Sequence, residues 1–164
     1  MPNIDHGALS GEQRRFIDDM AALLIPWGMQ PSLAQLYPYL LLKAQPVSLD
    51  DIAENLGMAK SSASVAARML ERYGLARRYG EPGSKRVRYG ASESYSGFIS
   101  SQAELMGSLG RMIEVRAPAV AEEDALRRLT YLGSFNRKME ATILDRIRQL
   151  TEEFVSCGPD EDQR

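Results

Sequence analysis

Two short amphipathic segments separated by a glycine occupy the middle of the sequence. The first segment has apolar residues at the i, i+3, i+4 and i+7 positions of one helical face, namely Leu49, Ile52, Ala53 and Leu56. Ser48 precedes them and Asp51 follows Ser48 by three positions, which is the spacing of a capping box with Asp in place of Glu. Gly57 comes next and can adopt the left-handed conformation that ends a helix and turns the chain. The pattern predicts a helix over 48–56 followed by a tight turn.

The segment after this turn predicts a second helix, Lys60–Tyr73, and then two strands. Small and apolar residues fall on one face of this helix and permit close helix packing: Ala63, Ala66, Ala67, Leu70 and Tyr73. The two strands should cover 75–79 and 87–91, because the Pro82-Gly83 pair between them favours a turn. Helix, turn, helix and hairpin in this order is the layout of the winged helix-turn-helix fold. We therefore predict a mainly α fold with a small β-hairpin wing and flanking dimerisation helices.

Two helices are expected on the N-terminal side of this unit. The first should run from Ser10 to about Trp27, with apolar residues at successive steps of four, three and four along one face. The second should be capped by Ser32, end near Gln45 and kink at Pro38.

The C-terminal third predicts two more helices, the second of which is long for a small domain. The first should cover 94–116 and be broken by Pro118, and the second should cover 122–155. More than 30 helical residues extend about 45 Å at 1.5 Å per residue, which is farther than a compact core of this size covers. We therefore expect the first and last helices to pack on a second copy of the chain. The interface residues would be Phe16, Met20, Leu23, Leu132, Phe135, Met139, Ile143, Ile147, Leu150 and Phe154.

The length of 164 residues, with 44% hydrophobic and 26% charged residues, suits one folded domain with an assembly element. The expected division is a flexible tail, an N-terminal dimerisation helix, a winged-helix DNA-binding domain, a C-terminal helical dimerisation region and a disordered tail. These parts cover 1–9, 10–29, 30–92, 93–156 and 157–164 respectively. No apolar run reaches the roughly 20 residues of a membrane span, and we expect a cytoplasmic protein with no membrane partner.

The charge of the chain is distributed unevenly, although its net value is only −2. Residues 60–88 contain eight basic and two acidic side chains, a net charge of +6, which leaves −8 for the rest. A basic patch on an acidic body is typical of a local anion-binding surface. Double-stranded DNA is the partner that this distribution indicates.

The predicted DNA contacts lie on the second helix of the pair and on the hairpin. An α-helix fits the major groove, where short hydroxyl side chains meet base edges, an apolar side chain meets a thymine methyl and arginine meets guanine or phosphate. Basic residues of a wing meet phosphates or the minor groove. The candidate DNA-binding residues are Ser48, Lys60, Ser61, Ser62, Ser64, Val65, Arg68, Lys85, Arg86 and Arg88. For an isolated helix a solvated polar face would be the simpler interpretation, but the order of the elements favours DNA.

The sequence offers little for catalysis or metal binding, and we expect no enzyme, cofactor or metal site. The single histidine, His6, and the single cysteine, Cys157, both lie in expected tails, too few preferred ligands for structural zinc. Asp50 and Asp51 are adjacent at a helix start, where carboxylates usually serve as caps. Residues 80–85 have glycines and a lysine, but not in the order of a phosphate-binding loop.

Four aromatic residues flank the expected dimer interface: Trp27, Tyr37, Tyr39 and Tyr131. Such rings could line a pocket for a small effector, and a cationic one would suit them. Core packing is the alternative interpretation, and it is the more common role for aromatic residues on helices.

Three stretches of the sequence occur in the same order as the corresponding motifs of a known family. They are Leu40–Leu42 through Pro46–Met58, then Ser61–Val65 with Leu70–Leu75, and finally Pro82–Arg86. In this order they resemble the MarR-type winged helix-turn-helix transcription regulators, specifically the GbsR branch, over residues 30–91. The resemblance implies a homodimeric regulator, often a repressor, whose first and last helices form the dimer, in a branch associated with choline and glycine betaine metabolism.

The chain departs from this family at two positions. Ala59 stands where the family usually has a serine, so the helix cap is expected to shift to Ser61. Ser84 stands where an acidic residue is common, which leaves the geometry of the wing tip open. No segment matches a diagnostic effector site, so the resemblance implies no particular ligand for this chain.

The sequence therefore predicts a sequence-specific regulator that binds a pseudo-palindromic operator as a homodimer and responds to an effector. One alternative is a winged-helix protein-interaction module that does not bind DNA, which an acidic recognition face would have favoured. An enzyme of unknown type is the other, and the absence of a histidine, cysteine or carboxylate cluster opposes it.

Overall fold

The computed structural model describes residues 8–80 and 82–156. The chain forms two compact units that divide between Tyr95 and Ser96. Residues 1–7 of the expected N-terminal tail, 1–9, and all of the expected C-terminal tail, 157–164, lie outside the described residues, and so do His6 and Cys157. None of the described helices is long and apolar enough to span a bilayer.

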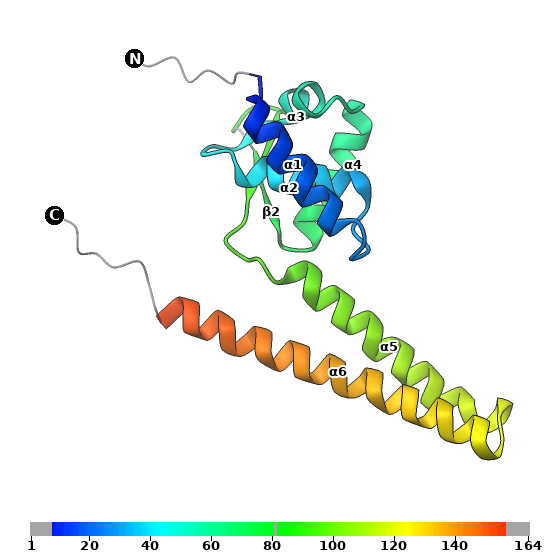
Figure 1. Ribbon diagram of the computed structural model, residues 1–164. Coiled ribbons are helices and arrows are strands. Elements are labelled where there is room, and N and C mark those ends of the chain that lie inside the picture. Colours follow the sequence, from blue (N-terminus) through cyan, green and yellow to red (C-terminus); the bar gives the residue numbers. More distant parts are fainter. Residues whose placement is uncertain (1–7, 81, 157–164) are drawn as a thin grey trace. The chain divides into compact units, whose positions relative to one another are not determined.

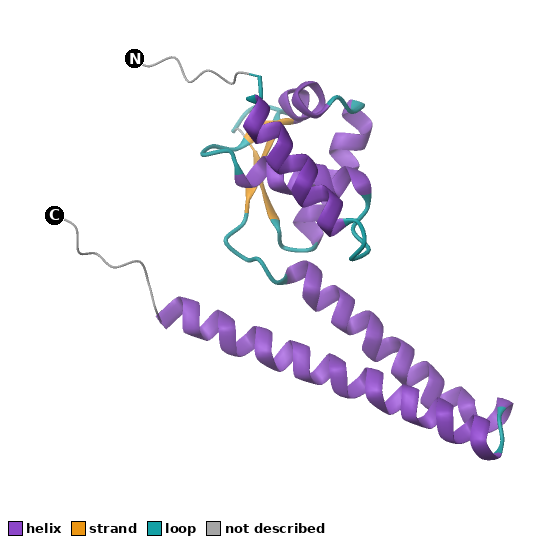
Figure 2. Cartoon of the chain, viewed as in Figure 1, coloured by secondary structure: helices purple, strands orange, loops and turns teal. Residues whose placement is uncertain are grey.

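The first unit has the element order of a winged helix-turn-helix domain with one additional helix in front (Figure 1). Its elements are α1 (Gly11–Leu24), α2 (Pro31–Leu41), β1 (Val47–Ser48), α3 (Leu49–Leu56), α4 (Lys60–Arg72), β2 (Ala76–Gly80) and β3 (Val87–Ala91). The strands form an antiparallel sheet in the order β1-β3-β2 beside the helices (Figure 2). The predicted fold class is confirmed. The two-residue strand β1 was not predicted, because so short a strand leaves no pattern in the sequence.

Helix α2 forms the centre of this unit. Seven of its eleven residues are buried, and Leu36, Tyr39 and Leu40 have no exposed surface. The predicted cap at Ser32 is wrong, because Gln30 is the N-cap residue and makes no side-chain cap hydrogen bond. Pro31 instead occupies the first helical position, where a missing amide costs no hydrogen bond.

Helix α1 begins as predicted and ends earlier. Ser10 and Gln13 form a reciprocal capping box at its N-terminus. The helix ends at Leu24 rather than near Trp27, because the chain turns over 25–28 and Gly28 has a φ of 96°. Its buried residues are Ile17 and Ala21.

The second unit is a pair of packed helices, α5 (Gly97–Val120) and α6 (Glu123–Ser156). A side chain at Gly110 would lie 2.7 Å from the backbone oxygen of Gly133, so small residues allow the two helices to approach closely. Arg111 binds Glu140 at 2.9 Å and joins the helices at their surface. The predicted end of α5 at Pro118 is wrong, because this proline lies inside the last turn. Pro118 has no amide to bond the carbonyl four residues earlier, and the helix continues for only two residues beyond it.

Candidate nucleic-acid interface

The helix-turn-helix begins with the capping box that the sequence predicted. The Ser48 hydroxyl accepts the Asp51 amide at 3.1 Å and donates to the Asp51 carboxylate at 2.6 Å. The same carboxylate accepts the Ser48 amide at 3.2 Å. Ser48, a predicted DNA contact, therefore uses its hydroxyl within the protein to fix the start of α3.

The turn between α3 and α4 depends on Gly57. This residue has a φ of 63° and a ψ of 34°, the left-handed conformation that side chains with a Cβ disfavour. The amide of Met58 then donates to the carbonyl of Ala53 at 3.0 Å, which closes the end of α3. The turn directs the chain into α4 after two further residues.

Helix α4 has one buried face and one exposed face, as predicted. Its alanines and Leu70 pack inward: Ala63, Ala66, Ala67 and Leu70 are fully buried. The predicted DNA contacts on this helix face outward, apart from Ser64, which is half-buried. Val65, an apolar side chain on the same face, is 51% exposed. This is the geometry that a groove-reading helix requires.

The predicted cap at Ser61 is wrong. Helix α4 starts at Lys60, and Ala59 is its N-cap residue without a side-chain cap hydrogen bond. Ser61 is the second residue of the helix and is exposed. Residue 59 is an alanine, so α4 begins without a capping hydroxyl.

The two charged residues among the predicted DNA contacts of α4 have partners within the protein and remain exposed. The ammonium of Lys60 binds the Asp50 carboxylate of α3 at 2.6 Å, and both side chains are more than half exposed. The Arg68 Nε donates to the carbonyl of Ser64 at 3.3 Å, one turn earlier in the same helix. An exposed ion pair such as that of Lys60 and Asp50 contributes little stability.

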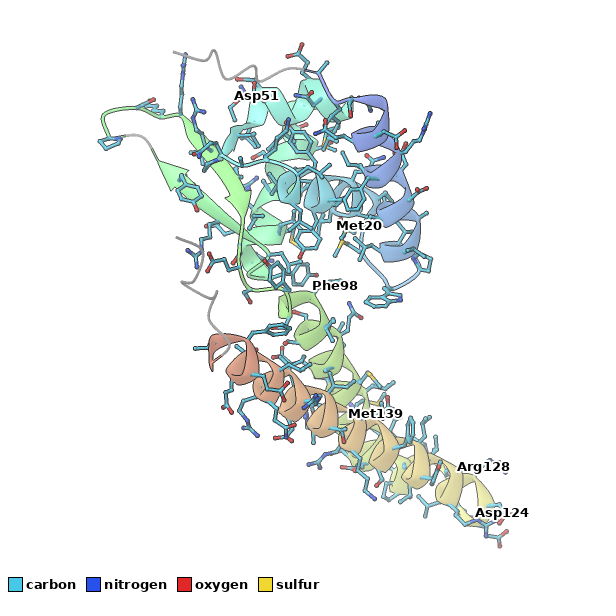
Figure 3. The ribbon with its side chains drawn as sticks, turned by 60° about the vertical axis from the view of Figure 1, so that its left-hand side comes forward. Met20, Asp51, Phe98, Asp124, Arg128 and Met139 are labelled. Atoms are coloured by element: carbon cyan, nitrogen blue, oxygen red, sulfur yellow. The ribbon has the colours of Figure 1, made fainter. Side chains whose placement is uncertain are left out.

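The wing is the hairpin of β2 and β3 (Figure 3). Four of the five β2 residues are exposed, among them Arg77 and Arg78. At the tip, Gly83 has a φ of 78°, and the Ser84 hydroxyl accepts the amide of Arg86 at 3.0 Å. Ser84 therefore shapes the loop itself.

The predicted basic residues of the wing have different environments. Lys85 and Arg86 are exposed in the loop between the strands. Arg88 lies in the central strand β3 opposite Ser48 and Tyr79, and it is half-buried. Arg77 and Arg78 were counted in the basic patch but were not among the predicted contacts. In β2 only Ala76 is buried, so Arg77 and Arg78 are both exposed. The sequence alone does not show this exposure, because it depends on how the strand lies in the sheet.

The predicted dimer residues lie on two different units and keep much of their surface in the described chain. The exposed ones are Phe16, Leu23, Leu132, Phe135 and Phe154, and the half-buried ones are Met20, Met139, Ile143, Ile147 and Leu150. On α5, the outward face adds Leu105, Leu109 and Met112. Figure 3 shows the side chains that line α5 and α6.

The four predicted pocket aromatics fall into two groups. Tyr37 and Tyr39 are core residues of α2, with 7% and 0% of their surface exposed. The Lys43 ammonium lies 5.0 Å from the centre of the Tyr39 ring, a cation–π contact within the chain. Trp27 is exposed in the first unit, and Tyr131 is exposed in the second, where it stacks on Phe135. The core alternative therefore describes the two tyrosines of α2.

Two tyrosines have perturbed acidity. Burial raises the pKa of Tyr39 to about 12, with a smaller contribution from the Asp51 charge, while the hydrogen bond from Asn55 acts in the opposite direction. Burial also raises the pKa of Tyr37, with a further contribution from Tyr95.

Within residues 8–80 and 82–156, no group of three or more histidine, cysteine or acidic residues is placed to hold a metal ion.

Comparison with known proteins supports the helix-turn-helix assignment. A family model described as the IclR helix-turn-helix domain matches residues 38–80, which include α3 and α4. A solved structure described as a transcriptional regulator has a TM-score of 0.73 at 20% identity, covering 86% of this chain and 99% of its own. No curated protein matches the chain.

Two further solved structures are similar at lower scores. A MepR mutant from a multidrug-resistant S. aureus clinical isolate is 20% identical, covers 85% of this chain and 90% of its own, and has a TM-score of 0.39. The regulator Tm0710 from Thermotoga maritima is 18% identical, covers 80% and 91%, and has a TM-score of 0.41. The winged helix-turn-helix fold rests on the elements of the first unit and on the similarity at a TM-score of 0.73. The GbsR branch stays a prediction.

Proposed function

We propose that this protein is a cytoplasmic transcription regulator that binds a specific DNA sequence as a homodimer. The observation that supports this most directly is the exposed face of α4, which combines short hydroxyl side chains, Val65 and Arg68 within a helix-turn-helix. An α-helix with such a face matches the width and the chemistry of the major groove. The exposed Lys85 and Arg86 of the wing would bind the adjoining phosphates.

The charge of the domain supports the same proposal. Residues 60–88 have a net charge of +6 in a chain of net charge −2. Lys60 is paired with Asp50 in the free protein, and a phosphate would compete for its ammonium on binding. Because released counterions drive this association, affinity should fall steeply with salt concentration.

A homodimer would account for the exposed apolar residues of α1 and α6. Phe16, Leu23, Phe135 and Phe154 are costly to leave in water, and burial against a second copy would remove that cost. Two-fold symmetry then predicts a pseudo-palindromic operator with half-sites about one helical turn, or 34 Å, apart. The family resemblance adds repression as the proposed sign of regulation.

Control by a small effector is a further part of the proposal. An effector would act by binding better to one spacing of the two recognition helices than to another. Trp27 and Tyr131 are the exposed aromatic side chains among the four candidates, so they are the ones to test for ligand binding.

The test is selection of binding sites from random duplexes, followed by affinity measurements on two matched variants. Arg68→Ala removes a predicted base contact, whereas Arg72→Ala removes the same charge at the last residue of α4. We expect Arg68→Ala to lose about 1–3 kcal/mol of binding free energy on the selected duplex, and Arg72→Ala to lose less. Equal losses of binding free energy in the two variants would mean that Arg68 contributes only its positive charge and makes no base contact. Failure to enrich any duplex would contradict DNA binding and favour the protein-interaction alternative.

A further inference from the structure

Arg14 connects α1 to the C-terminal end of α3. Its Nη2 donates to the backbone carbonyl of Asn55 at 2.9 Å, between residues 41 positions apart in the sequence. Carbonyls in the last turn of a helix have no partner within that helix and attract cations. The carbonyls of Ala53 and Glu54 accept amides from the turn. Arg14 donates to the next carbonyl of the last turn, that of Asn55.

Asn55 itself joins three helices. Its side chain is buried, and its Nδ2 donates to the Tyr39 hydroxyl of α2 at 3.3 Å and to the backbone carbonyl of Asp51 at 2.9 Å. Its backbone carbonyl receives Arg14 from α1. This residue lies two positions before Gly57, so α1 and α2 are both attached close to the turn that leads into α4.

We propose that Arg14 is a positioning residue for the DNA-reading helix. It would hold the end of α3, and through the turn it would fix the direction in which α4 leaves. The start of α4 has no side-chain cap of its own, so its first turn depends on what precedes it. The inference rests on the proposed function, because the orientation of α4 decides which bases a groove-reading helix can reach.

The hydrogen bond from Arg14 to Asn55 also couples the position of α1 to the turn between α3 and α4. Helix α1 presents Phe16 and Leu23 as exposed apolar side chains, so anything that binds them also acts on the helix that holds Arg14. A shift of α1 would lengthen or break the bond to Asn55 before it affected the buried bond to Tyr39.

The experiment compares Arg14→Ala with Arg15→Ala. Both substitutions remove one positive charge from the same helix. Arg15, however, pairs with Glu12 at 2.7 Å, and both residues of this ion pair belong to α1. The measured quantity is the ratio of affinities for a selected duplex and a random duplex. We expect Arg14→Ala to lower this ratio roughly three- to tenfold, the order expected when a cation leaves a helix C-terminus, and Arg15→Ala to leave it within twofold. Arg14→Lys should restore part of the loss, because an ammonium can donate to the same carbonyl.

Amide hydrogen exchange on the full chain gives a second measurement that does not depend on DNA. Exchange at Gly57 and Met58 should be faster in Arg14→Ala than in Arg15→Ala, with the buried amides of α2 unchanged. Equal affinity ratios and equal exchange in the two variants would overturn the inference. If the unmodified chain bound no duplex, the proposed function would fail. The exchange measurement would still test whether the hydrogen bond from Arg14 to Asn55 stabilises the turn. If exchange were unchanged in a chain that does bind, only the role of Arg14 would fail.

Discussion

The wing offers the prediction with the clearest magnitude. Lys85 and Arg86 are both exposed in the loop between β2 and β3, and a homodimer has two such loops. If each side chain neutralises one phosphate, the double substitution Lys85→Ala with Arg86→Ala removes four contacts from the dimer. The logarithm of affinity falls with the logarithm of salt by about 0.9 per contact, so the slope should become shallower by about 3.6. Between 50 and 200 mM salt, the unmodified protein should lose about 150-fold more affinity than the variant.

The assay is a fluorescence anisotropy titration of a labelled operator duplex at four or more salt concentrations. The control is Arg15→Ala with Arg127→Ala, which removes the same charge from two exposed side chains that pair within their own helices. We expect the control to keep the slope of the unmodified protein. A wing variant with the unmodified slope would mean that the wing does not touch phosphate, and a control with the same shallower slope would show a general charge effect.

The remaining predictions concern stability. Gly110→Ala should lower the free energy of unfolding by about 1–3 kcal/mol, because the new methyl group would meet the backbone oxygen of Gly133 at 2.7 Å. Gly107→Ala is the matched control in the same helix, since its nearest neighbour is the movable carboxylate of Glu140, and denaturant titration should rank it well above Gly110→Ala. The raised pKa of Tyr39 means that ionisation opposes folding, so stability present below pH 10 should be lost as the pH rises towards about 12. Tyr39→Phe should flatten this alkaline loss in titrations at fixed denaturant, and an unchanged pH profile would contradict the assignment to Tyr39.

Local signals in the sequence were enough to predict the helix-turn-helix. The capping box of Ser48 and Asp51 and the left-handed Gly57 each require only neighbouring residues, and the structure has both features. The buried face of α4 followed from helical periodicity for the same reason. Periodicity cannot tell which apolar residues meet their own chain, so Ile17 rather than Phe16 proved to be buried in α1.

The errors arose where two local rules compete. Ser32 is a good cap residue, but Pro31 at the first helical position decided where α2 begins. Pro118 breaks helices in the interior, but in the last turn of α5 it did not. Tyr39 belongs to the core because α2 is surrounded by the other elements of its unit, which helical periodicity alone does not reveal.

Contacts between distant segments had no signal at all. The bond from Arg14 to Asn55 spans 41 positions and involves a backbone carbonyl, which any residue would supply. The half-buried position of Arg88 depends on β1 pairing with β3, and β1 has only two residues. Such features become visible only when the segments are placed in space.

The central claim is that two copies of this chain place their α4 helices in successive major grooves of one operator. The most direct measurement is a footprint on a duplex selected from random sequences. We expect two protected segments whose centres lie about 10 base pairs apart, with protection lost in Arg68→Ala before it is lost in Arg72→Ala. A single protected segment would contradict the paired arrangement. If the selected duplex showed no protected segment at protein concentrations that saturate a random duplex, the claim that α4 reads sequence would be contradicted.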